Sequence, residues 1–200
     1  EFASEMVMEA GARDLTIEER PIVYHERRGE ATLESFRDGW RHVRFMLLNA
    51  PGYLFIGPGG VMSSLGMVLM GLVIFNIHIG PMNFGNHSLI AGSLMVLVGY
   101  QVASLGIFAT IAGDPIRRPN DPVTEFVTAN LTLEKAATVG TIIGVSGILY
   151  AGWLVTSWMS SGFEALPMMV NDIVAFSAIM LGVQTVFGAF FFSTLAQNSG

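Results

Sequence analysis

Two adjacent arginines beside a glycine are the residues of this chain best suited to binding an anion. Arg27, Arg28 and Gly29 lie in the polar stretch H-E-R-R-G-E-A-T at residues 25–32. Guanidinium groups hold phosphate oxygens through paired hydrogen bonds, and glycine lets backbone approach a ligand closely. The stretch could therefore bind a phosphate. A solvated turn without a ligand is the alternative, because charged surface loops are common.

Three further arginines lie on the helix that the next segment predicts. Apolar residues in residues 33–47 recur at spacings of three and four, which defines one stripe of an α-helix. Such a helix suits the membrane surface, where rings enter the acyl boundary and each arginine near an anionic leaflet contributes about 1 kcal/mol. A soluble helix packed on a domain is the alternative. The stripe is Leu33, Phe36, Trp40, Val43 and Leu47, and beside it lie Arg37, Arg41 and Arg44.

The composition indicates a membrane protein. Of the 200 residues, 52% are hydrophobic and 13% charged, whereas soluble domains carry about 25% charged residues. The formal charge of −6 argues against nucleic acid as a partner. The chain has no cysteine, which excludes disulfides, thiolate metal sites and a cysteine nucleophile.

Four apolar segments are long enough to cross a bilayer, since about 20 residues rising 1.5 Å each cover its hydrocarbon core. We therefore predict a mainly α-helical, polytopic membrane protein, with residues 33–51 as an amphipathic juxtamembrane helix and residues 52–200 as a four-helix transmembrane domain. Val123, Phe126, Val127 and Leu131 indicate a short surface helix between the second and third spans. The predicted spans are residues 54–77, 88–112, 136–158 and 170–195.

The first 32 residues resemble the end of a soluble domain. A short helix is expected over residues 1–12. Residues 15–24 predict an edge strand, because Leu15 and Ile17 alternate with polar neighbours and Pro21 interrupts the run. One helix and one strand cannot bury a core of their own. The chain is therefore expected to be the downstream part of a longer protein.

The cations predict the orientation. Every Lys and Arg lies before residue 45 or within residues 117–135, and the connections at residues 77–87 and 159–167 contain none. With four crossings, the cationic and cation-free segments fall on opposite sides, as the positive-inside rule requires. We expect a multi-pass protein of the cytoplasmic membrane with both termini in the cytoplasm.

Several polar residues lie within or near the spans. We expect Gln101 and Gln184 to hydrogen-bond across helices, with substrate contact as the alternative. His78 and His87 flank one connection without an acidic companion, so they do not predict a metal site. Asp172 is expected at the membrane interface.

Small residues four apart allow helices to approach closely. They could pack inside one four-helix unit or between copies in a homo-oligomer, and the sequence leaves both open. The pairs are Gly140 with Gly144, Gly147 with Ala151, and Ala178 with Gly182.

Three stretches match a known pattern: E-F-A-S-E-M-V at the start, R-P-I-V-Y-H-E-R-R-G-E-A-T-L, and S-F-R-D-G-W-R-H-V-R-F-M-L-L-N-A-P. They resemble the membrane-attached family 2 glycosyltransferases, which transfer sugars to polyprenyl or dolichyl phosphate. The family has P-I-x-Y, then an arginine and G-E-S-K-L, where this chain has its second stretch. The third is similar to the juxtamembrane segment of a prokaryotic subgroup. G-Y-Q at residues 99–101 and G-V-Q-T-V-F at residues 182–187 are similar more loosely.

The resemblance implies a cytoplasmic catalytic domain of the α/β GT-A type, of which residues 1–32 would be the C-terminal remnant. That domain would use a nucleotide sugar and Mg²⁺ or Mn²⁺, and pass the sugar to a polyprenyl phosphate. The resemblance places the catalytic, donor-binding and metal-binding residues upstream of Glu1. The chain has no D-x-D motif, so we expect it to be inactive by itself.

The resemblance also implies an acceptor-phosphate site. Arg27 matches the motif arginine, while Ala31 and Thr32 replace the family's serine and lysine. General anchoring to the lipid surface is the alternative for the helix arginines, and a structural ion pair is the alternative for Glu5. The candidates are Arg27, Arg28, Arg37, Arg41 and Arg44, with Glu5 and Gly29 in support.

Two other functions fit four apolar spans. A flippase or transporter subunit for lipid-linked sugars would need polar groups at the bilayer midplane, where only Gln101 and Gln184 qualify. A noncatalytic membrane scaffold would need only helices that assemble. Transfer of a sugar from a nucleotide to polyprenyl phosphate distinguishes the enzyme from both.

Overall fold

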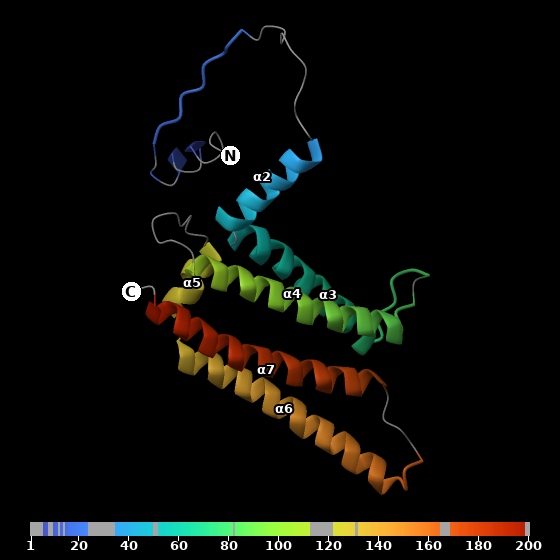
Figure 1. The fold of residues 1–200 in the computed structure, drawn as a ribbon. Helices are drawn as coiled ribbons and strands as arrows, with labels where there is room; N and C mark the ends of the chain where they lie inside the picture. Colours follow the sequence, from blue (N-terminus) through green and yellow to red (C-terminus); the bar gives the residue numbers. More distant parts are fainter. Residues whose placement is uncertain are drawn as a thin grey trace.

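The structure is a computed structural model. Nearly all of its regular secondary structure is helical. The structure describes residues 6–7, 10–11, 13, 15–23, 35–49, 52–81, 83–112, 122–130, 132–164 and 169–198. The elements are α2 (Ser35–Asn49), the π-helical turn η1 (Gly52–Ile56), α3 (Gly57–Ile74), α4 (Asn86–Ala112), α5 (Pro122–Asn130), α6 (Leu133–Ser160) and α7 (Met169–Asn198) (Figure 1).

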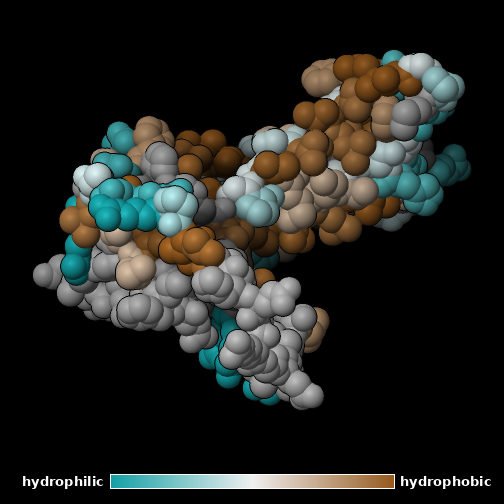
Figure 2. All heavy atoms as spheres, turned by 90° about the horizontal axis from the view of Figure 1, so that it is seen from above, coloured by the Kyte–Doolittle hydropathy of each residue, from teal (hydrophilic) through white to brown (hydrophobic). Residues whose placement is uncertain are grey.

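Four helices are long and apolar enough to cross a membrane, namely Leu54–Ile74, Asn86–Ala112, Leu133–Ser160 and Met169–Leu195. The four predicted spans are therefore confirmed, with ends that differ by at most three residues. Their outer faces are apolar, and hydrophobic residues cover much of the coloured surface in Figure 2. The predicted surface helix after the second span is also confirmed, as α5.

The spans form two helical hairpins that lie side by side (Figure 1). Helix α3 packs along α4, and α6 packs along α7. The hairpins meet through α4 and α7. Helix α4 is therefore the element that joins the first hairpin to the second.

Small residues at intervals of seven line the contact within each hairpin. A repeat of seven gives 3.5 residues per turn, which keeps one stripe against the partner when two helices cross with a left-handed twist. Lipid provides no hydrophobic force between helices, so close backbone packing must hold them together. The buried small residues with this spacing are Gly59 and Gly66 on α3, Gly92, Gly99 and Gly106 on α4, Gly140 and Gly147 on α6, and Ala175, Gly182 and Ala189 on α7.

The glycines are required because the opposite backbone occupies the space of a side chain. A Cβ on Gly99 would lie 2.5 Å from the amide nitrogen of Ser63, and one on Gly182 would collide with the backbone of Gly144. A Cβ on Gly140 would lie 2.9 Å from the amide nitrogen of Val186. Gly140, Gly144 and Gly182 therefore pack inside one unit, which decides between packing inside one unit and packing between copies for these three residues.

The edge strand predicted over residues 15–24 is wrong for its described part. Residues 15–23 form neither helix nor strand, and their side chains are exposed. A strand is stabilised by the ladder it forms with a neighbour. The described residues provide no partner strand, and Pro21 lacks an amide donor. The short helix before it is confirmed where described, at Met6–Val7 and Ala10–Gly11.

The first span begins with a π-helical turn that the sequence did not predict. Pro58 lies in the first turn of α3 and has no amide hydrogen to donate to a preceding carbonyl. The regular ladder cannot continue backward through it. The wider turn of η1 accommodates this interruption between α2 and the span.

The contact between α6 and α7 predicts that the same substitution affects stability very differently at Gly182 and at Gly152. Gly182→Leu should lower the free energy of unfolding by at least 1–3 kcal/mol, because the added atoms meet backbone of α6 that cannot rotate away. Gly152→Leu is the matched control, since nothing lies within 4 Å of a Cβ there. Thermal unfolding in detergent measures both. Equal melting temperatures for the two variants would contradict the packing described above.

Candidate functional site

The amphipathic helix α2 has both its rings and its cations exposed. Phe36 is 90% exposed, Trp40 60% and Val43 44%. Arg37, Arg41 and Arg44 are exposed as well. These apolar side chains are not packed into the described part of the chain, so they remain available to a membrane surface. This is the arrangement expected of an interfacial helix rather than of a soluble core helix.

Helix α2 lies at one end of the bundle, together with α5 and the C-terminal end of α7 (Figure 1). The turn η1, which follows α2 along the chain, packs against α4 and α5. Gly106 allows this contact, because a Cβ there would lie 2.9 Å from the Cβ of Phe55. We call this the arginine-bearing end, defined by α2, η1, α5 and the adjoining ends of α4, α6 and α7.

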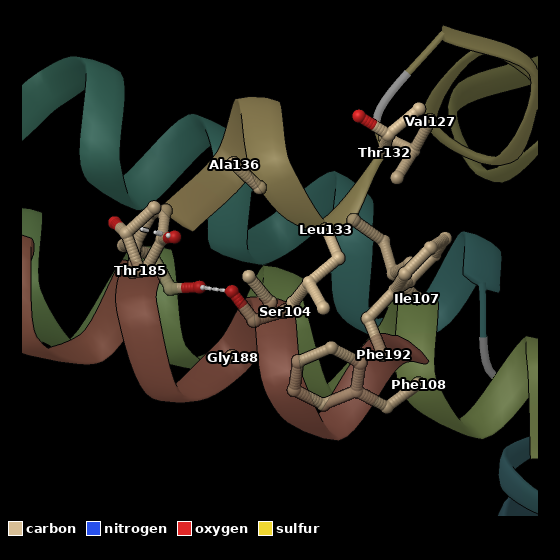
Figure 3. Close-up of a pocket in the computed structure, with 12 residues that line it drawn as sticks. Ser104, Ile107, Phe108, Val127, Thr132, Leu133, Ala136, Thr185, Gly188 and Phe192 are labelled. Carbon is tan, nitrogen blue, oxygen red and sulfur yellow. Dashed lines mark hydrogen bonds between the residues drawn. The ribbon is translucent and has the colours of Figure 1, made fainter. Parts of the chain in front are cut away.

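A cavity of about 210 Å³ opens at the arginine-bearing end, between α4, α5, α6 and α7 (Figure 3). Ile107 and Phe108 of α4 and Phe192 of α7 form part of its wall. Leu133 and Ala136, in the first turn of α6, also line it. The cavity therefore extends along the membrane-spanning helices from their end near α5.

The polar groups in the cavity wall are bonded to the protein itself. The Thr185 hydroxyl donates to the carbonyl of Leu181 at 2.7 Å, so in the 2.9 Å contact between Tyr100 Oη and Thr185 Oγ1 the tyrosine is the donor. Ser104 donates to the carbonyl of Tyr100 at 2.8 Å. Thr132 caps α6 by accepting from the amide of Lys135. With its hydroxyls bonded in this way, the cavity suits a hydrocarbon rather than a polar solute.

Four candidates lie outside the described residues: Glu5, Arg27, Arg28 and Gly29. Their placement in an acceptor-phosphate site stays a prediction. The structure gathers the other three candidates, Arg37, Arg41 and Arg44, on α2. The described residues contain no group of three or more His, Asp or Glu that could hold a metal ion.

The polar contact between the hairpins is not the one predicted. The carbonyl oxygen Oε1 of Gln184 is buried and has no hydrogen-bond partner in the described part of the chain. Gln101 is exposed. Instead Tyr100 bonds to Thr185, each one residue from a predicted glutamine. Neighbouring residues on a helix point about 100° apart, so the sequence indicated the correct turn of each helix but the wrong side chain.

Comparison with known proteins gives the family. Residues 109–196, which run from the end of α4 into α7, match the family model described as the glycosyltransferase family 2 C-terminal transmembrane region. The chain is also 49% identical over 197 residues to the low-salt glycan biosynthesis hexosyltransferase Agl6 of Haloferax volcanii. It belongs to the family 2 glycosyltransferases, as their membrane region.

This alignment covers 98% of the chain and 48% of the relative. The glycosyltransferase membrane region described here therefore spans about half the length of the curated relative it matches. No solved structure matches the chain.

The hydrogen bond between the hairpins predicts a modest loss of stability in Tyr100→Phe. Interhelical hydrogen bonds in membranes contribute about 0.6 kcal/mol on average and at most about 1.7 kcal/mol. We expect a loss in this range, measured by thermal unfolding in detergent. Tyr150→Phe removes a hydroxyl from α6 for which the described residues provide no hydrogen bond, and should have no effect. Equal losses in the two variants would show that the Tyr100 hydrogen bond contributes nothing specific.

Proposed function

We propose that this chain is the membrane-anchoring and acceptor-presenting part of an enzyme that transfers a hexose from a nucleotide sugar to a polyprenyl phosphate of the dolichyl type. The observation that carries the proposal is the combination at one end of the bundle of exposed arginines on an interfacial helix and an apolar cavity. The relative's name supports hexose as the transferred sugar. We infer the acceptor from the arginines of α2 and from the apolar cavity.

The arginines suit the phosphate of such an acceptor. With α2 flat on the membrane, Phe36 and Trp40 enter the acyl boundary and the guanidinium groups lie level with lipid phosphates. A guanidinium group can donate two parallel hydrogen bonds to the oxygens of one phosphate. Arg37, Arg41 and Arg44 would draw the acceptor to this surface, and Arg27 and Arg28, which precede α2 in the sequence, would hold its phosphate for reaction.

The cavity suits the hydrocarbon next to that phosphate. An apolar cavity of about 150 Å³ stays dry and admits benzene, so one of the size found here has room for about one isoprenoid unit or slightly more. Phe108 and Phe192 contribute ring surface to its wall, and Gly188 of α7 also lines it without a side chain (Figure 3). An acceptor anchored at this depth would keep its phosphate near α2.

In the transfer step, an oxygen of the acceptor phosphate bonds to the anomeric carbon of the sugar as the bond to the nucleotide diphosphate breaks. A divalent cation, Mg²⁺ or Mn²⁺, would neutralise the departing diphosphate in a GT-A catalytic domain belonging to the rest of the protein. The arginines of this chain would lower the repulsion between the two phosphate-bearing reactants. The described cations of α2 and Lys135 in the first turn of α6 lie at the arginine-bearing end. The connections at residues 77–87 and 159–167 contain no Lys or Arg, so we assign the arginine-bearing end to the cytoplasmic face.

Neutralising the three helix arginines tests the proposal. In the full-length protein, Arg37→Gln, Arg41→Gln and Arg44→Gln together should raise KM for polyprenyl phosphate on the order of 100-fold, since each contributes about 1 kcal/mol. Arg20→Gln is the control, because Arg20 is exposed and pairs with Glu18. The measurement is sugar transfer in vesicles containing the acceptor.

Transfer that is unchanged in the triple variant would contradict acceptor presentation by α2. Movement of a lipid-linked sugar across the vesicle membrane without any nucleotide sugar would favour the transporter alternative instead.

Filling the cavity tests the position of the acceptor's hydrocarbon. A Cβ on Gly188 would lie 3.5 Å from Cζ of Phe108, an ordinary contact, so the outer carbons of Gly188→Leu should occupy the cavity. We expect KM for polyprenyl phosphate to rise at least tenfold with little change in kcat. Gly152→Leu adds the same atoms to an open face of α6. Equal KM values in the two variants would exclude the cavity as an acceptor site.

A further inference from the structure

Gln101 places an amide near the middle of the bilayer on the outer surface of α4. It is the sixteenth of the 27 residues of Asn86–Ala112, about 3 Å along the axis from the helix centre. Its side chain is exposed, and the described residues provide it with no hydrogen bond. A primary amide transferred to hydrocarbon without a hydrogen bond loses several kcal/mol. An amide at this depth therefore requires a partner beyond the described residues.

The residues around Gln101 form a stripe suited to another helix. Leu94 is 55% exposed, Val98 47% and Leu105 52%. With Gln101 they are spaced by four, three and four residues, the spacing of the contact seam in a left-handed helix pair. We call these four residues the Gln101 stripe.

The Gln101 stripe lies on a side of α4 that the bundle does not use. Gly92 and Gly99 face α3, where added Cβ atoms would meet Gly66 and Ser63. Tyr100 faces α7 through its bond to Thr185. At about 100° per residue, its members lie between roughly 100° and 180° around the helix from Gly92 and Gly99. They lie between roughly 100° and 160° from Tyr100, so the stripe is directed away from both neighbours.

We infer that a second copy of this chain covers the Gln101 stripe. An amide both donates and accepts, so two Gln101 side chains related by a twofold axis along the membrane normal satisfy each other. Lipid tails offer neither donor nor acceptor. A single polar residue in an apolar seam also sets register and the number of helices. The glycine stripes do not compete for this role, because they are buried inside each hairpin.

Disulfide cross-linking tests the pairing. The chain has no cysteine, so Val98→Cys introduces one thiol a single turn from Gln101 and close to the proposed axis. The full-length protein would be used in phosphatidylglycerol vesicles, with any cysteine outside this chain changed to serine. Under an oxidant we expect a covalent dimer on non-reducing gels. Ile148→Cys, on the 59% exposed position of α6, is the matched control and should stay monomeric.

A second variant separates amide pairing from general apolar contact. Gln101→Leu added to Val98→Cys should reduce the cross-linked fraction about five- to tenfold at limiting protein density, because it removes interhelical bonds of about 1–1.4 kcal/mol in total. The melting temperature of the detergent-solubilised monomer should not fall, since Gln101 is exposed within one copy.

Three outcomes would overturn the inference. Val98→Cys could cross-link no better than Ile148→Cys, or it could cross-link equally well with and without Gln101→Leu. In a membrane extract it could form a disulfide with a different protein and none with itself. The first and third results would assign the stripe to something other than a second copy, and the second would show that the Gln101 amides do not hold the two copies together.

Discussion

Close contact between glycine backbones is the constraint on which the rest of this structure depends. Within a bilayer the surrounding lipid is as apolar as the side chains, so helices associate through packing and hydrogen bonds. Each hairpin meets this condition with small residues every seven positions, and the contacts are too close for a Cβ at Gly99 or Gly182. The result is two tightly packed hairpins, α3 with α4 and α6 with α7. The contact between α4 and α7 then determines where the cavity lies.

The contact between the hairpins is of a different kind. Tyr100 bonds to Thr185, and Phe108 contacts Phe191 edge to face with ring centroids 5.1 Å apart. Rings and hydroxyls hold α4 and α7 farther apart than glycines would, and a cavity lies beside this contact. The cavity is located at the arginine-bearing end, where η1 connects α2 to the spans. Exposed arginines and an apolar cavity are thus combined in one region.

Much of this architecture could be predicted from the sequence, because hydropathy and helical period act over many residues. The four spans, α2 and α5 were predicted on that basis. The prediction of a strand over residues 15–24 was wrong for the described part. Alternation of apolar and polar residues shows only that a strand would have two different faces, and not that a second strand is present to pair with it. The sequence showed the small residues at intervals of seven only in part, as pairs four residues apart. Glycines that pack against no other helix, such as Gly152, lie among those that form the contact within each hairpin.

The polar contacts were harder to predict. Hydropathy identified Gln101 and Gln184, but the bond formed is between their neighbours Tyr100 and Thr185. A difference of one residue turns a side chain by about 100°, so it depends on helix rotation, which only the packed structure specifies. The cavity is likewise assembled from four helices, and no local pattern encodes it.

The central claim is that an isoprenoid phosphate is held at the arginine-bearing end. It is tested most directly by light-induced cross-linking of the full-length protein, in vesicles, to a polyprenyl phosphate with a diazirine in the isoprenoid unit next to the phosphate. Our account predicts cross-links concentrated on α2 and on the cavity wall of α4 and α7, which unlabelled polyprenyl phosphate reduces by competition. Cross-links spread evenly over the spans, as a diazirine phospholipid would give, would contradict it.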